Sequence, residues 1–198
     1  MHPHSSEQIV GILLAAGRGR RFDPSGKQSK LLQFLPDGQT VLASAAKNLR
    51  ACSPTYVVCR SDTPAATMQL AQQCDGSVLL TCADADDGMA ATLVCGLKQT
   101  ANAAGWVIAL GDMPYVQVAT LVALKTALEQ GADIAVPVFN QRRGNPVAFS
   151  RHHLSRLLQL RGDQGARSLL QQFPVTEVAV DDPGIHQDID TVADIPHS

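Results

Sequence analysis

A cationic turn of small residues follows the first apolar run of the chain. The run at residues 9–15 is almost continuously apolar, a pattern typical of a strand buried on both faces of a parallel sheet. The residues after it, AGRGRR, include two glycines, so backbone N–H groups in the turn can approach a phosphate closely. This turn predicts a triphosphate site, with an ordinary glycine turn as the alternative. Positive side chains gather in or near it: Arg18, Arg20, Arg21, Lys27 and Lys30.

Two better-known phosphate motifs do not fit this turn. The dinucleotide-binding fingerprint requires a third glycine, and Phe22 stands in that place. A Walker A loop requires a glycine five residues before Gly26-Lys27, where the chain has Arg21. Gln28 occupies the position of the magnesium-binding Ser or Thr of that motif. The sequence therefore predicts phosphate binding of another kind.

A carboxylate follows a second apolar run. Asp112 lies in the segment GDMP, directly after the run at residues 106–110. Parallel α/β sheets bind ligands beyond the carboxyl ends of their strands. Magnesium prefers oxygen ligands and commonly uses one or two carboxylates together with substrate phosphates. We therefore predict that Asp112 binds Mg²⁺, the alternative being a turn or N-cap aspartate ahead of Pro114.

Strand-like and helical patterns alternate along the chain at a spacing typical of βαβ units. This alternation predicts an α/β fold of three layers, α/β/α, around a mostly parallel sheet. Strands are expected at 9–15, 56–59, 78–82, 106–110 and 134–139, and helices at 41–52, 64–74, 89–101 and 118–130. The later part is expected to add strands at 146–149 and 175–180 and helices at 154–160 and 166–173.

The length of 198 residues predicts one domain over 1–198, with residues 1–7 as a disordered tail. A net charge of −2 and 4% aromatic residues give no reason to expect nucleic acid as a partner. Neither a membrane span nor a signal peptide is recognisable. The five cysteines include no C-x-x-C pair, which favours a reducing cytoplasm over zinc or disulfides.

Other polar clusters are predicted to lie at the surface without a part in the chemistry. A solvated acidic turn ahead of a helix is expected at Asp84, Asp86 and Asp87. The start of a later helix is expected to expose His152 and His153.

Several segments together resemble the MobA-like nucleotidyltransferases. LLAAGRGRRF, KLLQFLPDG and GDMP resemble the family at large. GMAATLVCGL, RGNPVAFS with RGDQGARSLL, and DIDTVADI resemble its molybdenum cofactor cytidylyltransferase (MocA-like) branch. The resemblance covers nearly the whole chain and implies a Rossmann-like fold of the nucleotide-diphospho-sugar transferase type. It also implies Mg²⁺-dependent transfer of CMP from CTP to the phosphate of the molybdenum cofactor (molybdopterin), with release of pyrophosphate.

The resemblance assigns catalytic roles to Arg21, Lys30 and Asp112. Lys27 remains a rival of Lys30, because the chain carries an insertion between Arg21 and Lys30. The resemblance also implies that the nucleotide is bound by Leu14, Ala15, Ala16, Gly17, Gly19, Arg21, Lys30, Gly88, Met89 and Thr92. Ala16 favours CTP, because the guanylyl-transferring relatives typically have glycine there and an added methyl group narrows the base pocket.

The closing D-x-D-T element implies a second metal ligand. Alternate residues of an extended segment point to opposite faces, so only one of Asp188 and Asp190 is expected to face the metal. Asp188 is preferred, together with Asp112.

Matching the family pattern implies that the acceptor binds near Asn145, Pro146 and Arg167, although Asn145 replaces a histidine often found in the family. Arg142 and Arg143 either bind an anionic acceptor or lie in a solvated turn. The substrates are small molecules, and a molybdenum hydroxylase apoenzyme is a candidate partner. A guanylyl or sugar-phosphate nucleotidyltransferase and a non-catalytic cofactor carrier remain the alternatives.

Overall fold

The computed structural model describes residues 8–60, 74–162 and 166–195. Within these ranges one mixed sheet of eight strands forms the middle layer. The strands run in the order β3-β2-β1-β4-β7-β5-β6, and β8 also pairs with β5. Their bounds are β1 Ile9–Ala15, β2 Thr55–Arg60, β3 Val78–Cys82, β4 Gly105–Leu110, β5 Ile134–Phe139, β6 Arg142–Arg143, β7 Val147–Ser150 and β8 Thr176–Ala179.

Four parallel strands in the order β3-β2-β1-β4 bring their carboxyl ends to one edge of the sheet. The register pairs Ala15 with Cys59, and Leu14 with Leu110. In the second half of the sheet, β7 runs antiparallel to both β4 and β5. The turns that follow β1 and β4 therefore lie side by side, as the sequence predicts.

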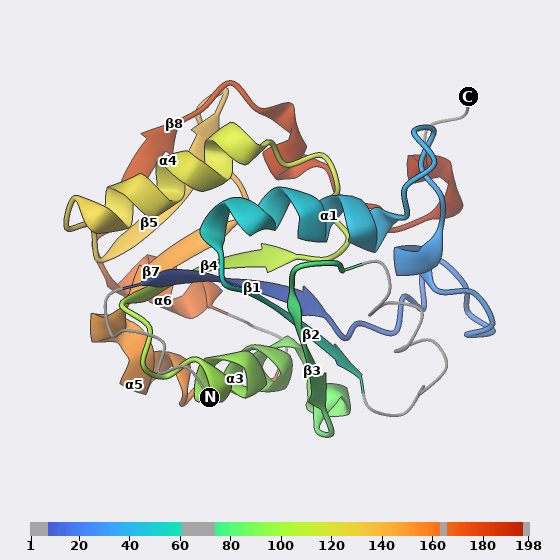
Figure 1. Cartoon of the computed structure of the whole chain (residues 1–198), viewed down its shortest axis with the longest axis horizontal. Coiled ribbons are helices and arrows are strands. Elements are labelled where there is room, and N and C mark those ends of the chain that lie inside the picture. The colour runs from blue at the N-terminus through green and yellow to red at the C-terminus, as the bar shows by residue number, and fades with distance from the viewer. Residues whose placement is uncertain (1–7, 61–73, 163–165, 196–198) are drawn as a thin grey trace.

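Helices cover both faces of the sheet (Figure 1). One face carries α1 (Val41–Leu49) and α4 (Val118–Glu129), and the other carries α3 (Met89–Gln99), α5 (Leu154–Leu157) and α6 (Arg167–Gln172). Short 3-10 helices connect these elements: η1 Lys30–Leu32, η2 Arg50–Cys52, η3 Ala85–Asp87, η4 Arg151–His153, η5 Pro183–His186 and η6 Val192–Asp194.

Successive side chains of the central strands point to opposite faces of the sheet and so contribute to two apolar cores. Leu13 and Val107 pack toward α1 and α4, while Ile12 and Ile108 pack toward α3. Each strand therefore buries side chains on both faces, which is why its sequence is continuously apolar. The three-layer α/β fold predicted from the sequence is confirmed.

Helix α3 lies close to the sheet because Gly96 faces it. A Cβ atom at Gly96 would lie 3.0 Å from Val58 and 3.1 Å from Ile12, so a larger residue would require these side chains or the helix to shift. At the C-terminal end of α3, the Trp106 indole N–H donates to the Thr100 hydroxyl at 2.9 Å. These contacts fix α3, whose first turn borders the site described below.

The predicted strands and helices that lie in the described ranges are observed to within a few residues, whereas β6 was not predicted. Two expectations fall on residues that are not described. These are the tail at 1–7 and nearly all of the helix at 64–74. The five cysteines are free thiols, and only Cys95 is not fully buried. In the described ranges, no helix is both long and apolar enough to cross a membrane.

His153 is buried, so the prediction of an exposed side chain there is wrong. Its exposed fraction is 3%, and its ring packs edge-on against Phe149 and Phe173, with centroid distances of 6.0 and 4.9 Å. The Nδ1 atom is buried without a hydrogen-bond partner among the described residues. Burial lowers the pKa of His153, because the protonated ring would lose its hydration there. Its neighbour His152 is exposed, as predicted.

Candidate active site

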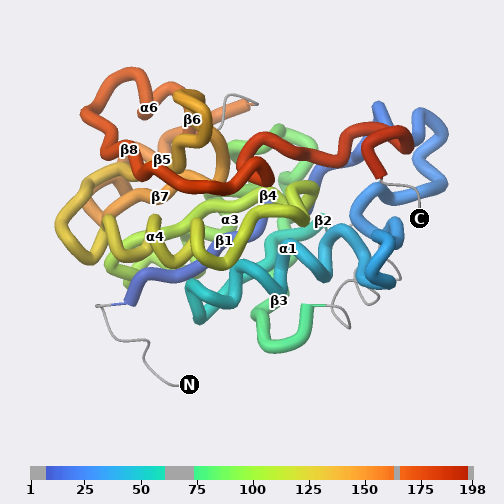
Figure 2. Tube along the Cα trace, turned by 90° about the horizontal axis from the view of Figure 1, so that it is seen from above, coloured from blue at the N-terminus to red at the C-terminus, as the bar shows by residue number. Residues whose placement is uncertain are grey.

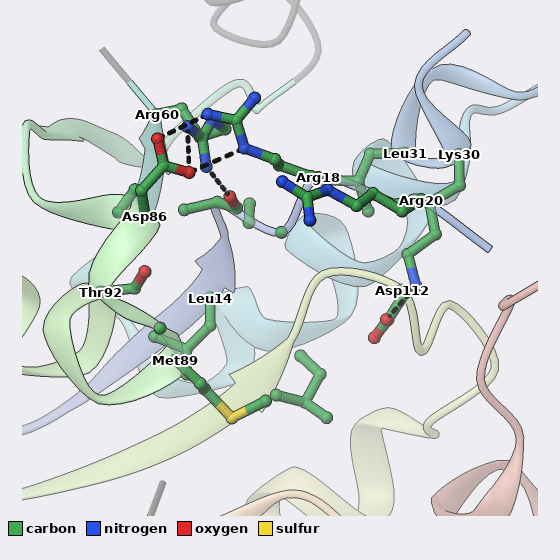
Figure 3. Close-up of a pocket in the computed structure, with 17 residues that line it drawn as sticks. Leu14, Arg18, Arg20, Lys30, Leu31, Arg60, Asp86, Met89, Thr92 and Asp112 are labelled. Atoms are coloured by element: carbon green, nitrogen blue, oxygen red, sulfur yellow. Dashed lines mark hydrogen bonds and ion pairs between the residues drawn. The ribbon is translucent and has the colours of Figure 1, made fainter. Parts of the chain in front are cut away.

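A cavity of about 360 Å³ opens at the carboxyl ends of the parallel strands (Figure 3). The turn after β1, the start of η1, the end of β2, the junction of η3 with α3 and the end of β4 all line it. The cavity brings together nine of the ten residues predicted to bind the nucleotide: Leu14, Ala15, Ala16, Gly17, Gly19, Lys30, Gly88, Met89 and Thr92. Arg21, the tenth, is exposed, and its guanidinium reaches Asp190 instead.

The turn after β1 places backbone against the cavity. Ala16 is 3% exposed, and its carbonyl oxygen accepts a hydrogen bond from Arg60 at 3.2 Å. A Cβ atom on Gly17 would meet no atom of the protein within 4 Å, so space remains open at this residue. Gly19 has a φ of +61°, which favours glycine, and its carbonyl accepts from Phe22 N at 2.9 Å.

Lys30 joins two carboxylates at one end of the cavity. Its Nζ lies 2.6 Å from Asp112 Oδ2 and 3.0 Å from Asp190 Oδ1. Only 11% of the Lys30 side chain is exposed. Burial by itself would lower the pKa of Lys30, but the charges and hydrogen bonds of Asp112 and Asp190 outweigh it and raise the pKa. Lys27, the rival in the sequence, is exposed and does not line the cavity.

The C-terminal segment delivers Asp190, rather than Asp188, to this cluster. It crosses from β8 toward the loop after β1 (Figure 2). Ile189 is buried and its N–H donates to the Asp112 carbonyl at 2.9 Å, while Asp188 is exposed. Since Asp190 contacts Lys30, the alternation expected from the sequence is present with the other aspartate facing the site.

A capping box holds Asp190 in this orientation. The carboxylate oxygen Oδ2 of Asp194 accepts from the backbone N–H groups of Asp190 at 3.1 Å and Thr191 at 2.6 Å. It also accepts from the Thr191 hydroxyl at 2.8 Å. The hydrogen bonds from Thr191 and Asp190 lower the pKa of Asp194. Thr191, the threonine of the D-x-D-T element, therefore helps to form the turn that orients Asp190.

Sequence reasoning missed Arg60, which lines the cavity at the end of β2. Asp86 joins Arg60 to Arg18: Arg60 donates to its Oδ1 at 2.8 Å, and Arg18 donates to both carboxylate oxygens (Figure 3). These hydrogen bonds hold the pKa of Asp86 well below its usual range. The sequence feature that could have indicated Arg60 is its position as a polar residue at the end of an apolar run, which forms β2 beside β1. The acidic turn is exposed as predicted, but Asp86 also contributes to the cavity wall.

The residues assigned to the acceptor lie outside the main cavity. Pro146 is buried, and Asn145 N donates to the Ile185 carbonyl at 3.0 Å. Both residues border a separate, smaller cavity. Arg167 is exposed at the start of α6.

The other acceptor-side segments pack at different places. Gly162, which precedes undescribed residues 163–165, accepts from Ala90 N at 3.0 Å, so this loop reaches the first turn of α3. Arg142 and Arg143 are exposed, and Arg143 pairs with Glu177 at 2.7 Å.

The arrangement suits phosphate chemistry assisted by a cation. Asp112 and Asp190 carry carboxylate oxygens of the kind that could hold a divalent cation, and the ammonium of Lys30 lies between them. Among the described residues, no three or more His, Cys, Asp or Glu side chains gather into a metal-binding group. A divalent cation held by these two carboxylates would need further oxygens from phosphates and water, which is usual for magnesium.

A mostly parallel sheet flanked by helices, with a cavity at the carboxyl ends of its parallel strands, is the architecture of the Rossmann-like nucleotide-sugar transferase fold, to which structurally similar nucleotidyltransferases belong. The family model described as "MobA-like NTP transferase domain" matches residues 11–178. The chain therefore belongs to the MobA-like NTP transferase family, and the family predicted from the sequence is confirmed. No curated protein sequence matches the chain.

Solved structures support this assignment. Rv0371c from Mycobacterium tuberculosis H37Rv is 30% identical with a TM-score of 0.78, covering 94% of this chain and 95% of that one. Its homolog from Mycobacterium sp. strain JC1 is 26% identical with a TM-score of 0.76, covering 96% and 93%. Molybdopterin-guanine dinucleotide biosynthesis protein A from Archaeoglobus fulgidus is 20% identical, with a TM-score of 0.67 and coverage of 94% and 95%, and shares the fold.

Proposed function

We propose that this nucleotidyltransferase transfers CMP from CTP to the phosphate of the molybdenum cofactor and releases pyrophosphate. The observation that carries the proposal is the single cavity that gathers the predicted nucleotide residues, with Lys30 and Asp112 at one end. We further propose that the chain acts as one domain in the cytoplasm and passes its product to a molybdenum hydroxylase apoenzyme.

Asp112 and Asp190 are the proposed ligands of Mg²⁺. Asp190 takes the role that the sequence favoured for Asp188, because its carboxylate shares Lys30 with Asp112. A related protein supports a divalent cation: Rv0371c, 29% identical in this case, has been solved in complex with manganese. Bound there, Mg²⁺ would neutralise charge on phosphate oxygens.

The reaction needs no side-chain nucleophile. An oxygen of the acceptor phosphate attacks the α-phosphorus of CTP, and the bond from that phosphorus to the leaving pyrophosphate oxygen breaks. An acceptor phosphate is already largely ionised near pH 7, so no strong base is required. The task of the protein is to align two anions and to neutralise their charge. In this proposal Lys30 steadies the triphosphate, and Arg21, whose exposed guanidinium now pairs with Asp190, steadies the leaving pyrophosphate.

Ala16 supports CTP as the nucleotide. Its methyl group is buried in the wall of the cavity, where a glycine would leave more room for a purine. Leu14 and Met89 add apolar surface, and Thr92 adds a hydroxyl group that is able to hydrogen-bond a base edge.

The test is pyrophosphate release by the full chain with Mg²⁺, molybdenum cofactor and each of CTP, GTP, UTP and ATP. We expect turnover with CTP and little with the other nucleotides. Asp112→Asn should keep the fold and lose most turnover, and Lys30→Ala should lose far more than the matched control Lys27→Ala.

Each other outcome selects an alternative. Equal or better use of GTP would make the protein a guanylyltransferase. Turnover with a sugar phosphate in place of the molybdenum cofactor would make the protein a sugar-phosphate nucleotidyltransferase. Cofactor binding without pyrophosphate release from any nucleotide would make it a carrier.

A further inference from the structure

The ammonium of Lys30 occupies the point where two carboxylates converge. Asp112 Oδ2 lies 2.6 Å away and Asp190 Oδ1 lies 3.0 Å away. The two carboxylates are 23% and 28% exposed, so they are partly screened from water. Arg21 also pairs with the other oxygen of Asp190, but Lys30 lies between the two carboxylates and reduces their mutual repulsion.

A divalent cation between the same carboxylates would lie within a few ångströms of that ammonium group. Two positive charges so close repel strongly in a partly buried site. The two ions are therefore alternatives for the same oxygens rather than neighbours. Binding of a metal by Asp112 and Asp190 requires that the ammonium of Lys30 leaves.

Displacement of Lys30 is expected to involve its side chain rather than the backbone. Leu31, the next residue of η1, is buried and anchors the main chain. The stem of Lys30 runs beside the turn after β1, because a Cβ atom on Gly19 would lie 3.4 Å from Lys30 Cγ. Rotation of a flexible four-carbon side chain is enough to turn the ammonium toward phosphates held by that turn.

We propose that Lys30 is a displaceable counter-ion that closes the metal site until a divalent cation arrives together with the nucleotide. This displacement rests on the proposed function and adds that stable metal binding follows or accompanies nucleotide binding. In the absence of nucleotide, Lys30 competes with the metal for Asp112 and Asp190. When a metal–triphosphate complex enters, the phosphates offer Lys30 new partners and the carboxylates pass to the metal.

The test is Mn²⁺ binding to the full chain without nucleotide, measured from the electron paramagnetic resonance signal of free Mn²⁺. Lys30→Met removes the charge and keeps most of the stem. It should bind Mn²⁺ at least about tenfold more tightly than the unaltered chain, because the competing charge is gone. Lys27→Met, which removes an exposed charge from the same loop, is the matched control and should leave the affinity unchanged.

Two further variants locate the effect. Lys30→Gln keeps a hydrogen-bond donor to the carboxylates and should also bind Mn²⁺ more tightly, which covers the case that Lys30→Met folds poorly. The double variant Lys30→Met/Asp190→Asn should lose the gain. Unchanged or weaker binding by both single Lys30 variants would overturn the displacement, as would a gain that survives in the double variant.

The two proposals fail separately. Tighter Mn²⁺ binding by the Lys30 variants, with no CTP turnover in the unaltered chain, would overturn the function and leave the displacement standing. CTP turnover by the unaltered chain, together with unchanged Mn²⁺ affinity in the Lys30 variants, would overturn the displacement alone.

Discussion

Asp182 is predicted to be a major anchor of the segment that carries Asp190. It is 1% exposed, and its carboxylate accepts three hydrogen bonds. Oδ2 accepts from Gln117 N at 2.9 Å and from the Thr120 hydroxyl at 2.6 Å, both at the start of α4. Oδ1 accepts from Gly184 N at 2.9 Å. The side chain therefore connects the C-terminal segment to the first turn of α4.

The magnitude follows from these contacts. Asp182→Ala removes the acceptor of three donors, two of which belong to the buried residues Thr120 and Gly184, and each buried donor without a partner costs about 1–3 kcal/mol. We expect a loss of about 3–5 kcal/mol in the free energy of unfolding. Asp182→Asn keeps one good acceptor and turns its amide toward another donor, which should cost about 2 kcal/mol.

Urea denaturation followed by circular dichroism measures these losses, provided that the slopes with denaturant agree between variants. The matched control is Asp181→Asn, an exposed neighbour, which should change stability by less than about 0.5 kcal/mol. A loss of less than about 1 kcal/mol in Asp182→Ala would refute the reasoning, because the carboxylate would then contribute little to the anchor.

Three further predictions concern acid stability, the capping box and the nucleotide turn. Burial lowers the pKa of His153, so below about pH 6.5 the unfolded chain takes up a proton there more readily than the folded chain. The free energy of unfolding should therefore fall with decreasing pH by up to about 1.4 kcal/mol per pH unit. Denaturation as a function of pH should show a shallower decline in His153→Leu but not in the exposed control His152→Gln. Thr191→Val should weaken Mn²⁺ binding several-fold and Thr191→Ser should restore it, whereas equal affinities would contradict the positioning role of the Asp194 turn. Gly17→Ala should unfold at the same urea concentration as the unaltered chain while its KM for CTP rises, and an unchanged KM would separate this glycine from the phosphates.

Local sequence patterns predicted the layers and the edge that carries the site. Continuous apolar runs such as that of β1 indicate strands buried on both faces, and βαβ alternation then brings their carboxyl ends together. The turn after β1 and Asp112 followed from this logic alone. Lys30 needed the resemblance to a family, since spacing by itself left Lys27 equally suited.

What the sequence did not predict depends on contacts between distant segments. Arg60 belongs to the site because β2 lies next to β1, an order that no local pattern states. His153 is buried because Phe149 and Phe173 close around it from separate elements. The choice of Asp190 depends on the rotation of an extended segment, which the Asp194 turn fixes.

The pairing of Lys30 with Asp190 also has a consequence for synthesis of the protein. The two residues are 160 positions apart, and the last strand of the sheet ends at Ala179. At a translation rate of about 5–20 residues per second, Asp190 is made roughly 8–30 seconds after Lys30. A nascent chain therefore contains every described strand before it has both carboxylates. Until residue 190 has left the ribosome, no folded intermediate has the paired carboxylates to which a divalent cation would bind.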